Sequence, residues 1–248
     1  MHQENSNGKQ TLPDFSHIPV AQQSETRALL GSGRHSNVYL IRKGESEFAL
    51  KAAASSSSGL SQLENEFGLL ARLRHPHLVE TYDFGRTDDG LAVFTMEHLN
   101  GKSIREASLA AGVKQIASWL SKACLGLDYL HTQGWIHGDV KPENLMVVNG
   151  SMPSVKWFDL GMAQQAESLN KALLGGTRRF MAPEIEKGII DFRSDIYSLG
   201  AVFFEILASH YLGQDTEFDS DSIAGQLNRM AHAGMQAPLA ELIASMTK

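Results

Sequence analysis

Two short segments of the chain carry polar residues of the types that phosphoryl transfer requires. The first contains Asp139, Lys141 and Asn144, and the second contains Asp159. Phosphoryl transfer needs a base that orients the attacking hydroxyl, oxygen ligands for Mg²⁺, and positive charge for the transferring group. Asp139 is of the first type, Asn144 and Asp159 of the second, and Lys141 of the third. The spacing therefore predicts a metal-dependent phosphoryl-transfer site.

The residues between these two segments predict how their polar ends meet. Leu145–Val148 and Val155–Phe158 are strand-like runs, and Asn149-Gly150 between them is a turn signal. An antiparallel strand, turn and strand would bring Asn144 and Asp159 close together.

Four stretches of sequence resemble protein kinase motifs, and they occur in the order of that family. Residues 136–144 and 158–161 resemble the catalytic loop and the metal-binding motif. Residues 31–38 resemble the glycine-rich loop, and residues 175–184 resemble the end of the activation segment. The chain is therefore similar to eukaryotic-type serine/threonine protein kinases, of the sort also found in bacteria.

The resemblance implies an α+β, bilobal protein-kinase-like fold, with an antiparallel-sheet N-lobe that holds one helix and a mainly helical C-lobe. We expect a flexible N-terminal tail over residues 1–24, the N-lobe over 25–98 and the C-lobe over 99–248. Kinases ordinarily continue to an arginine that pairs with the glutamate equivalent to Glu184. We therefore expect a C-lobe that is incomplete at its C-terminal end, with possible further domains after Lys248.

Composition limits the classes of function. The 248 residues, 42% of them hydrophobic, can bury a large core in one domain or in two lobes. A net charge of −6 provides no basic field for a phosphate backbone, so nucleic acid is not an expected partner. Cys124 is the only cysteine, which excludes an internal disulfide and favours a cytoplasmic location. No apolar run approaches the roughly 20 residues that cross a bilayer, so we expect no membrane segment in this chain.

Local patterns predict the elements that must position the site. Short runs of β-forming residues bounded by glycine predict strands, and apolar residues at steps of three and four predict helices. The expected strands are 27–30, 38–41, 48–51, 78–82 and 91–97, and the expected helices run from Leu63 to Leu70, Val113 to Leu130 and Asp195 to Ala208.

Two glycines in residues 31–38 would let backbone amides approach phosphates, although Ser36 stands where the third glycine of the family pattern lies. This segment alone fits an ordinary hairpin equally well. Lys51 ends a strand motif whose lysine contacts the α- and β-phosphates, and it favours nucleotide binding. The resemblance implies ATP contacts, direct or through a neighbour, from Gly31, Ser32, Gly33, Ser36, Val38, Ala49, Lys51, Glu66, Met96, Glu97 and Met146, and Mg²⁺ ligation by Asn144 and Asp159.

Either Glu64 or Glu66 could pair with Lys51, but two positions along a helix lie about 200° apart around its axis. Glu66 shares the apolar stripe with Leu63 and Leu70, so it should face inward. We therefore predict that Glu66 pairs with Lys51 and that Glu64 lies on a solvated face.

For the catalytic loop, the resemblance implies that Asp139 is the base and that Lys141 lies near the transferred phosphate. The acceptor would be a serine or threonine of a protein, and His137 would be structural. Many kinases have arginine in place of Gly138, and that arginine pairs with a phosphate on the activation loop. We therefore expect that phosphorylation at Ser168 or Thr177 is not required to order this loop.

Two other functions remain as alternatives. The His137-Gly138-Asp139 spelling also resembles aminoglycoside and choline phosphotransferases, which lack the pattern over residues 177–184. A pseudokinase, which is a nucleotide-regulated binding module without catalysis, is a different class of protein. The presence of Lys51 and the polar residues of the two catalytic segments argues against it.

Overall fold

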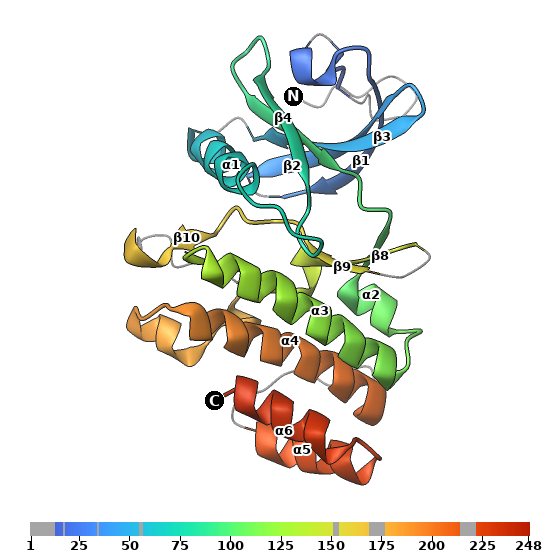
Figure 1. Cartoon of the computed structure of the whole chain (residues 1–248), viewed down its shortest axis with the longest axis vertical. Coiled ribbons are helices and arrows are strands. Elements are labelled where there is room, and N and C mark those ends of the chain that lie inside the picture. The colour runs from blue at the N-terminus through green and yellow to red at the C-terminus, as the bar shows by residue number, and fades with distance from the viewer. Residues whose placement is uncertain are drawn as a thin grey trace, which may run out of the picture. The chain divides into compact units, whose positions relative to one another are not determined.

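The computed structural model describes residues 13–16, 18–33, 35–54, 57–150, 154–168, 177–213 and 222–248. The chain divides into two compact units. The first holds the described chain up to Arg74 together with Val79–Leu99, and the second holds His75–Leu78 and Asn100–Lys248. The first unit is built on an antiparallel sheet and the second mainly on helices (Figure 1). This organisation confirms the predicted α+β, bilobal class.

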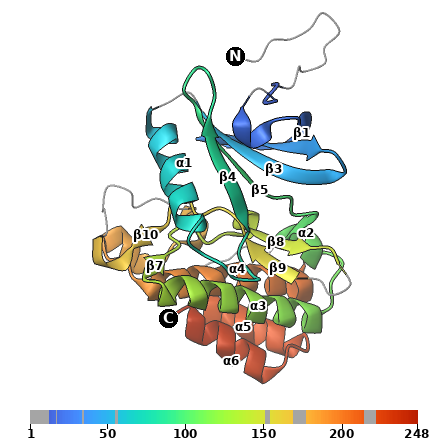
Figure 2. The ribbon, with the colours of Figure 1, turned by 45° about the horizontal axis from the view of Figure 1, so that its top comes forward.

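The first unit is a five-stranded sheet with strand order β1-β2-β3-β5-β4, in which every neighbouring pair is antiparallel. Helix α1 packs against β3, β4 and β5, and lies beside the sheet in Figure 2. Apart from one strand, the strands predicted for this unit and the helix around Leu63 are confirmed. The elements are β1 (Glu25–Ser32), β2 (Ser36–Lys43), β3 (Ser46–Ala53), α1 (Ser57–Leu70), β4 (Thr81–Arg86) and β5 (Ala92–Glu97).

The strand predicted over residues 78–82 is wrong in its position, because β4 begins only at Thr81. Leu78 instead forms a parallel bridge with Trp157, and the Trp157 N–H donates to the His77 carbonyl at 2.9 Å. These contacts join His75–Leu78 to the second unit. The predicted boundary between residues 98 and 99 therefore assigns His75–Leu78 to the N-lobe, whereas the structure places this segment in the second unit.

The structure also differs from the predicted flexible tail, because Phe15, Ile18 and Ala21 pack on the sheet. Phe15, Ile18 and Ala21 are 6%, 1% and 0% exposed, and the rings of Phe15 and Tyr39 lie 5.2 Å apart. The three apolar residues recur at steps of three, and Ile18 and Ala21 flank and end the short 3₁₀ turn η1 (Pro19–Ala21). They form one hydrophobic cluster with Tyr39, Ile41, Leu50, Ala52 and Val93.

Replacing Ile18 with alanine should therefore destabilise the first unit by about 3 kcal/mol, because it removes a buried aliphatic side chain and leaves a cavity. Urea unfolding of the 248-residue chain measures this change. The matched control is Ile189→Ala, because Ile189 is 53% exposed and its truncation should change stability by less than about 0.5 kcal/mol. If the two variants unfold alike, the segment at Ile18 does not belong to the folded unit.

The second unit is built around helix α4, which neighbours α3, α5 and α6. Helix α4 buries residues on all its sides between Ser194 and Ala208, with only Ile196 partly exposed, so it is the central helix of this core. It extends beyond the predicted Asp195–Ala208 at both ends. The helices, which Figure 1 shows stacked in layers, are α2 (Ile104–Ser108), α3 (Val113–Thr132), α4 (Phe192–Leu212), α5 (Ile223–His232) and α6 (Ala237–Met246).

The second unit also has short strands, of which β6 precedes α2 and β7 to β10 lie between α3 and α4. A three-stranded sheet has the order β6-β8-β9, and a two-stranded sheet pairs β10 with β7. The pairing of β8 with β9 is antiparallel, as the strand, turn and strand signal predicts. The strands are β6 (Gly101–Ser103), β7 (Trp135–Ile136), β8 (Leu145–Val148), β9 (Ser154–Trp157) and β10 (Gln164–Gln165). In the parts of the chain that the structure describes, no helix combines the length and apolarity that a bilayer span requires.

Candidate active site

Asp139, Lys141 and Asn144 converge in the second unit, as their spacing predicts. Lys141 Nζ donates to Asp139 Oδ2. Asn144 Nδ2 donates to the backbone oxygen of Asp139 at 2.8 Å and to Asp139 Oδ2 at 3.2 Å. Asn144 ends the 3₁₀ turn η2 (Pro142–Asn144) and is only 4% exposed. Because its amide nitrogen is used inside the loop, its oxygen is the atom that remains to reach a ligand.

Thr177 contacts the other oxygen of the same carboxylate. Its backbone N–H donates to Asp139 Oδ1 at 3.2 Å, and its Oγ1 lies 3.4 Å from that atom. The carboxylate is thus oriented from two sides, by Lys141 and Asn144 on one oxygen and by Thr177 on the other. In the sequence, Thr177 is a candidate phosphosite and the first residue of the pattern over residues 177–184. Nothing in the local pattern predicts this contact, since 38 residues separate the two positions.

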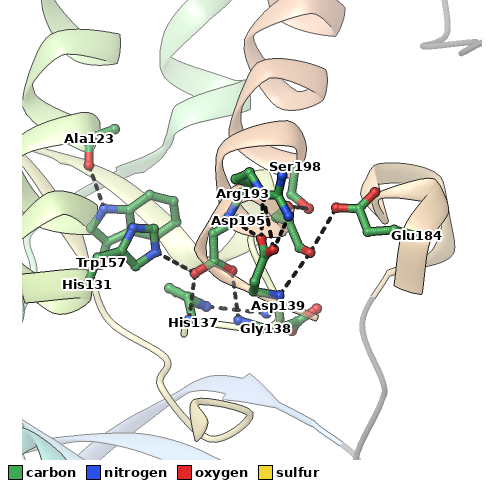
Figure 3. A network of polar contacts seen from close by, with 12 residues as sticks. Ala123, His131, His137, Gly138, Asp139, Trp157, Glu184, Arg193, Asp195 and Ser198 are labelled. Carbon is green, nitrogen blue, oxygen red and sulfur yellow. Dashed lines mark hydrogen bonds and ion pairs between the residues drawn. The ribbon is translucent and has the colours of Figure 1, made fainter. Parts of the chain in front are cut away.

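Asp195 supports the backbone of the catalytic loop (Figure 3). Its carboxylate accepts hydrogen bonds from the backbone N–H groups of His137 at 2.7 Å and Gly138 at 2.9 Å. The His131 ring Nε2 lies 2.8 Å from the same carboxylate. Asp195 is 2% exposed and lies in the first turn of α4, where the helix dipole favours a negative charge. These contacts hold the catalytic loop against the first turn of α4.

Asp195→Asn should reduce stability by about 2 to 3 kcal/mol, because one carboxylate oxygen becomes an NH₂ group that faces buried N–H donors. Guanidinium unfolding of the two proteins measures the loss. Asp128→Asn on α3 is the control, because Asp128 is exposed and its change should fall within about 0.5 kcal/mol. Equal stability of the two variants would contradict the role of Asp195.

His137 is fully buried, and its burial lowers the pKa of the imidazole, although the nearby carboxylate of Asp195 acts in the opposite direction. Its ring packs edge-on against Trp157 with centroids 5.0 Å apart. Trp157 Nε1 in turn donates to the Ala123 carbonyl at 3.0 Å, which ties β9 to α3 (Figure 3). These contacts fit the structural role expected for His137, and they fix the end of β9 just before Asp159.

Gly138 has a left-handed backbone, with φ of +75°. A Cβ atom added at this position would lie 2.9 Å from the Met162 carbonyl oxygen. Side chains rarely adopt this conformation without strain, so the loop as it stands suits glycine rather than arginine.

Asp159 and Asn144 are held near each other by the hairpin. The Phe158 N–H donates to the Asn144 carbonyl at 3.3 Å, and Asp159 Oδ1 accepts from the Gly161 N–H at 3.1 Å. Among the described residues, no cluster of three or more His, Cys, Asp or Glu side chains could form a metal centre by itself. One carboxylate and one amide oxygen nevertheless suit Mg²⁺, which takes its remaining ligands from water and phosphate.

In the first unit, Lys51 pairs with Glu66. Lys51 Nζ lies 2.7 Å from both carboxylate oxygens, and the two side chains are 7% and 2% exposed. Glu64 points elsewhere, forms an ion pair with Arg86 and is 38% exposed. The prediction that Glu66 is the partner is therefore confirmed. The two glutamates project from different sides of α1, and only the side with Glu66 faces Lys51.

The residues expected near the nucleotide lie on adjacent strands of the first unit. The strand register places Val38 opposite both Gly31 and Lys51, and Ala49 opposite Met96. Ala49 and Met96 are both 4% exposed. Glu97 ends β5, whereas Met146 lies on β8 of the second unit.

The turn between β1 and β2 is closed by a hydrogen bond from the Gly33 N–H to the Ser36 carbonyl at 2.8 Å. Ser32 Oγ donates to Asn37 Oδ1 at 2.7 Å. A Cβ atom at Gly31 would meet no described atom within 4 Å, and one at Gly33 would meet only the Ser36 oxygen at 3.4 Å. The packing of the first unit would therefore accept a side chain at either position. Glycine at these positions is consistent with a ligand that approaches the backbone closely.

Comparison with known proteins agrees with this geometry. A family model described as the protein kinase domain matches residues 24–245. The chain belongs to this family. The kinase domain is 32% identical to the serine/threonine-protein kinase PknB of Mycobacterium leprae over 205 residues, which are 76% of the chain and 33% of that protein. Two other relatives come from eukaryotes.

Mitogen-activated protein kinase kinase kinase 1a of Physcomitrium patens is 34% identical over 189 residues, which cover 71% of this chain and 24% of the relative. Myosin light chain kinase 3 of Danio rerio is 27% identical over 214 residues, which cover 83% and 29% respectively. All three relatives are named as kinases. The match spans a third or less of the length of each of these relatives.

Proposed function

We propose that this kinase domain transfers the γ-phosphoryl group of ATP to a serine or threonine hydroxyl of a protein. The observation that best supports the proposal is the cluster around Asp139, in which Lys141, Asn144 and Thr177 orient one carboxylate. A carboxylate fixed in this way can orient an acceptor hydroxyl and accept its proton.

The other residues of the second unit have complementary roles in this proposal. Lys141 supplies positive charge beside the transferring group, and Asn144 and Asp159 hold Mg²⁺ through oxygen atoms. When bound, Mg²⁺ neutralises charge that develops on the phosphates. Asp195 acts on the reaction only by positioning the loop.

The first unit would bind the nucleotide. Lys51 contacts the α- and β-phosphates, and Glu66 holds the Lys51 ammonium in place. Backbone amides at Gly31 and Gly33 approach the phosphates where side chains are absent. The remaining proposed residues are Ser32, Ser36, Val38, Ala49, Met96, Glu97 and, from the second unit, Met146.

The two alternatives are less well supported. The relatives named above are protein kinases, whereas only the tripeptide His137-Gly138-Asp139 suggests aminoglycoside and choline phosphotransferases. The polar groups that catalysis needs are all present, which disfavours a pseudokinase. Use of ATP and the single cysteine, Cys124, are our reasons for proposing a cytoplasmic location.

Parallel reactions test the proposal. The chain is incubated with labelled ATP and Mg²⁺ together with a mixed protein substrate, an aminoglycoside or choline, and each reaction is repeated with a chelator. We expect label only in protein, and only without the chelator. Label in a small molecule would favour the first alternative, and nucleotide binding without any transfer would favour a pseudokinase.

A further inference from the structure

A carboxylate is buried in the apolar core of the second unit. Glu205 lies in the middle of α4 and is 1% exposed. It forms ion pairs with Arg105 from α2 and with Arg179, whose Nη2 lies 2.6 Å from Glu205 Oε2. Burial of a charge is costly unless it is paired, so these arginines compensate Glu205. Glu205 thus holds together two segments that lie 74 positions apart.

The two arginines are not buried with it. The side chains of Arg105 and Arg179 are 41% and 36% exposed, and Arg178 next to Arg179 is exposed as well. We call Arg105, Arg178 and Arg179 the arginine face. It carries three positive charges against the single negative charge of Glu205, and that negative charge lies inside the protein. The outer side of the cluster is therefore positive.

The arginine face lies next to the proposed base. Thr177 contacts Asp139 directly, and Arg178 and Arg179 follow it in the turn η5 (Arg178–Phe180). Successive Cα atoms are about 3.8 Å apart, so these arginines begin within about 8 Å of the Thr177 Cα. A chain that presents its hydroxyl to Asp139 would run past them.

Among the described residues, two acidic groups close to the arginine face are already engaged by other parts of the chain. Glu205 is engaged by the chain's own arginines, and the Glu106 carboxylate accepts from the Ser103 N–H in the capping box of α2. Glu143 in η2, an element that neighbours α2, is exposed and could attract a cationic segment. Among the described residues, Glu205 and Glu143 together set two negative charges against the three positive charges of the arginine face, so the cluster stays positive.

We propose that the arginine face selects acceptor segments that carry anionic side chains within a few residues of the hydroxyl. This inference rests on the proposed function, since it names the substrate class of the same site. Guanidinium groups bind carboxylate and phosphate in the same fork geometry, so glutamate and phosphoserine are both suitable anions.

The test compares peptides that differ only in charge. Each has one serine flanked by glutamate, phosphoserine, glutamine or lysine at matched positions, and kcat/KM is measured with the full chain. We expect glutamate or phosphoserine peptides to exceed lysine peptides by at least about tenfold, with the ratio falling as salt rises. Preference for phosphoserine alone would identify a phosphate as the required anion.

Arg178 is the best residue to change, because it is not among the ion pairs of Glu205. Arg178→Glu should lower the ratio of kcat/KM for the glutamate peptide to kcat/KM for the lysine peptide at least about threefold. Arg178→Lys should preserve this ratio, because it keeps the positive charge. Arg229→Glu is the matched control, since Arg229 is exposed on α5, a helix that is not part of the arginine face. It should leave the ratio unchanged.

The outcomes separate this inference from the proposed function. If the wild-type chain labels all peptides equally, or if Arg178→Glu and Arg229→Glu behave alike, the arginine face does not select substrates although the domain is a kinase. If lysine peptides are preferred, Glu143 or another acidic group dominates and the inference is wrong. If no peptide and no protein is labelled, the proposed function itself fails.

Discussion

Asp139→Asn is expected to lower kcat by about 10²- to 10⁴-fold while nucleotide affinity stays nearly constant. Asparagine keeps the shape of the side chain but cannot accept the proton of the acceptor hydroxyl. It also loses the negative charge that Lys141 contacts. Single-turnover transfer measures the chemical step, and a fluorescent ATP analogue measures nucleotide binding separately.

Asp128→Asn provides the control for Asp139→Asn, because it makes the same chemical change at an exposed position on α3. Its turnover should equal that of the wild type. Turnover of Asp139→Asn within a few-fold of the wild type would contradict the assignment of Asp139 as base. Loss of ATP binding in a folded protein would indicate a nucleotide contact instead.

Glu66→Ala is expected to destabilise the first unit by about 3 to 5 kcal/mol, because it leaves the buried ammonium of Lys51 without the carboxylate that compensates its charge. The pair is nearly inaccessible to water, with side chains 7% and 2% exposed, so solvent cannot replace that carboxylate. Lys51→Ala should have a similar effect, because it removes the ammonium that compensates the buried carboxylate of Glu66. Urea unfolding of both variants measures these losses.

A double-mutant cycle tests whether Lys51 and Glu66 act as one unit. The double variant should be little worse than the worse single variant in both stability and single-turnover rate. Glu64→Ala is the control on the same helix, and its cost should be below about 1 kcal/mol because its pair with Arg86 is partly exposed. Additive losses in the cycle, or a larger loss at Glu64 than at Glu66, would contradict the pairing.

Sequence patterns predict local parts of this domain well. The residues from His137 to Asn144 lie in one short loop, and the hairpin of β8 and β9 follows from adjacent runs of β-forming residues. The choice of Glu66 over Glu64 follows from helix geometry alone. In each case the relevant residues are close in sequence, so spacing and periodicity determine which side chains can meet.

Contacts between distant segments could not be predicted in this way. Thr177 meets Asp139, and Glu205 meets Arg105 and Arg179, only after the helices of the second unit pack together. For the ion pairs of Glu205, the sequence offers one signal, which is a glutamate within an otherwise apolar run of α4. Phe15 and Ile18 lie in a mostly polar segment, whose composition predicts a flexible tail, and their burial depends on contacts with distant strands of the sheet.

The most direct test of the account is phosphoamino-acid analysis of protein that the wild-type chain and Asp139→Asn have labelled with ATP and Mg²⁺. We expect phosphoserine or phosphothreonine in the wild-type reaction and at least about a hundredfold less label with the variant. Phosphotyrosine as the main product, or equal labelling by both proteins, would contradict the assignment of a serine/threonine kinase that acts through Asp139.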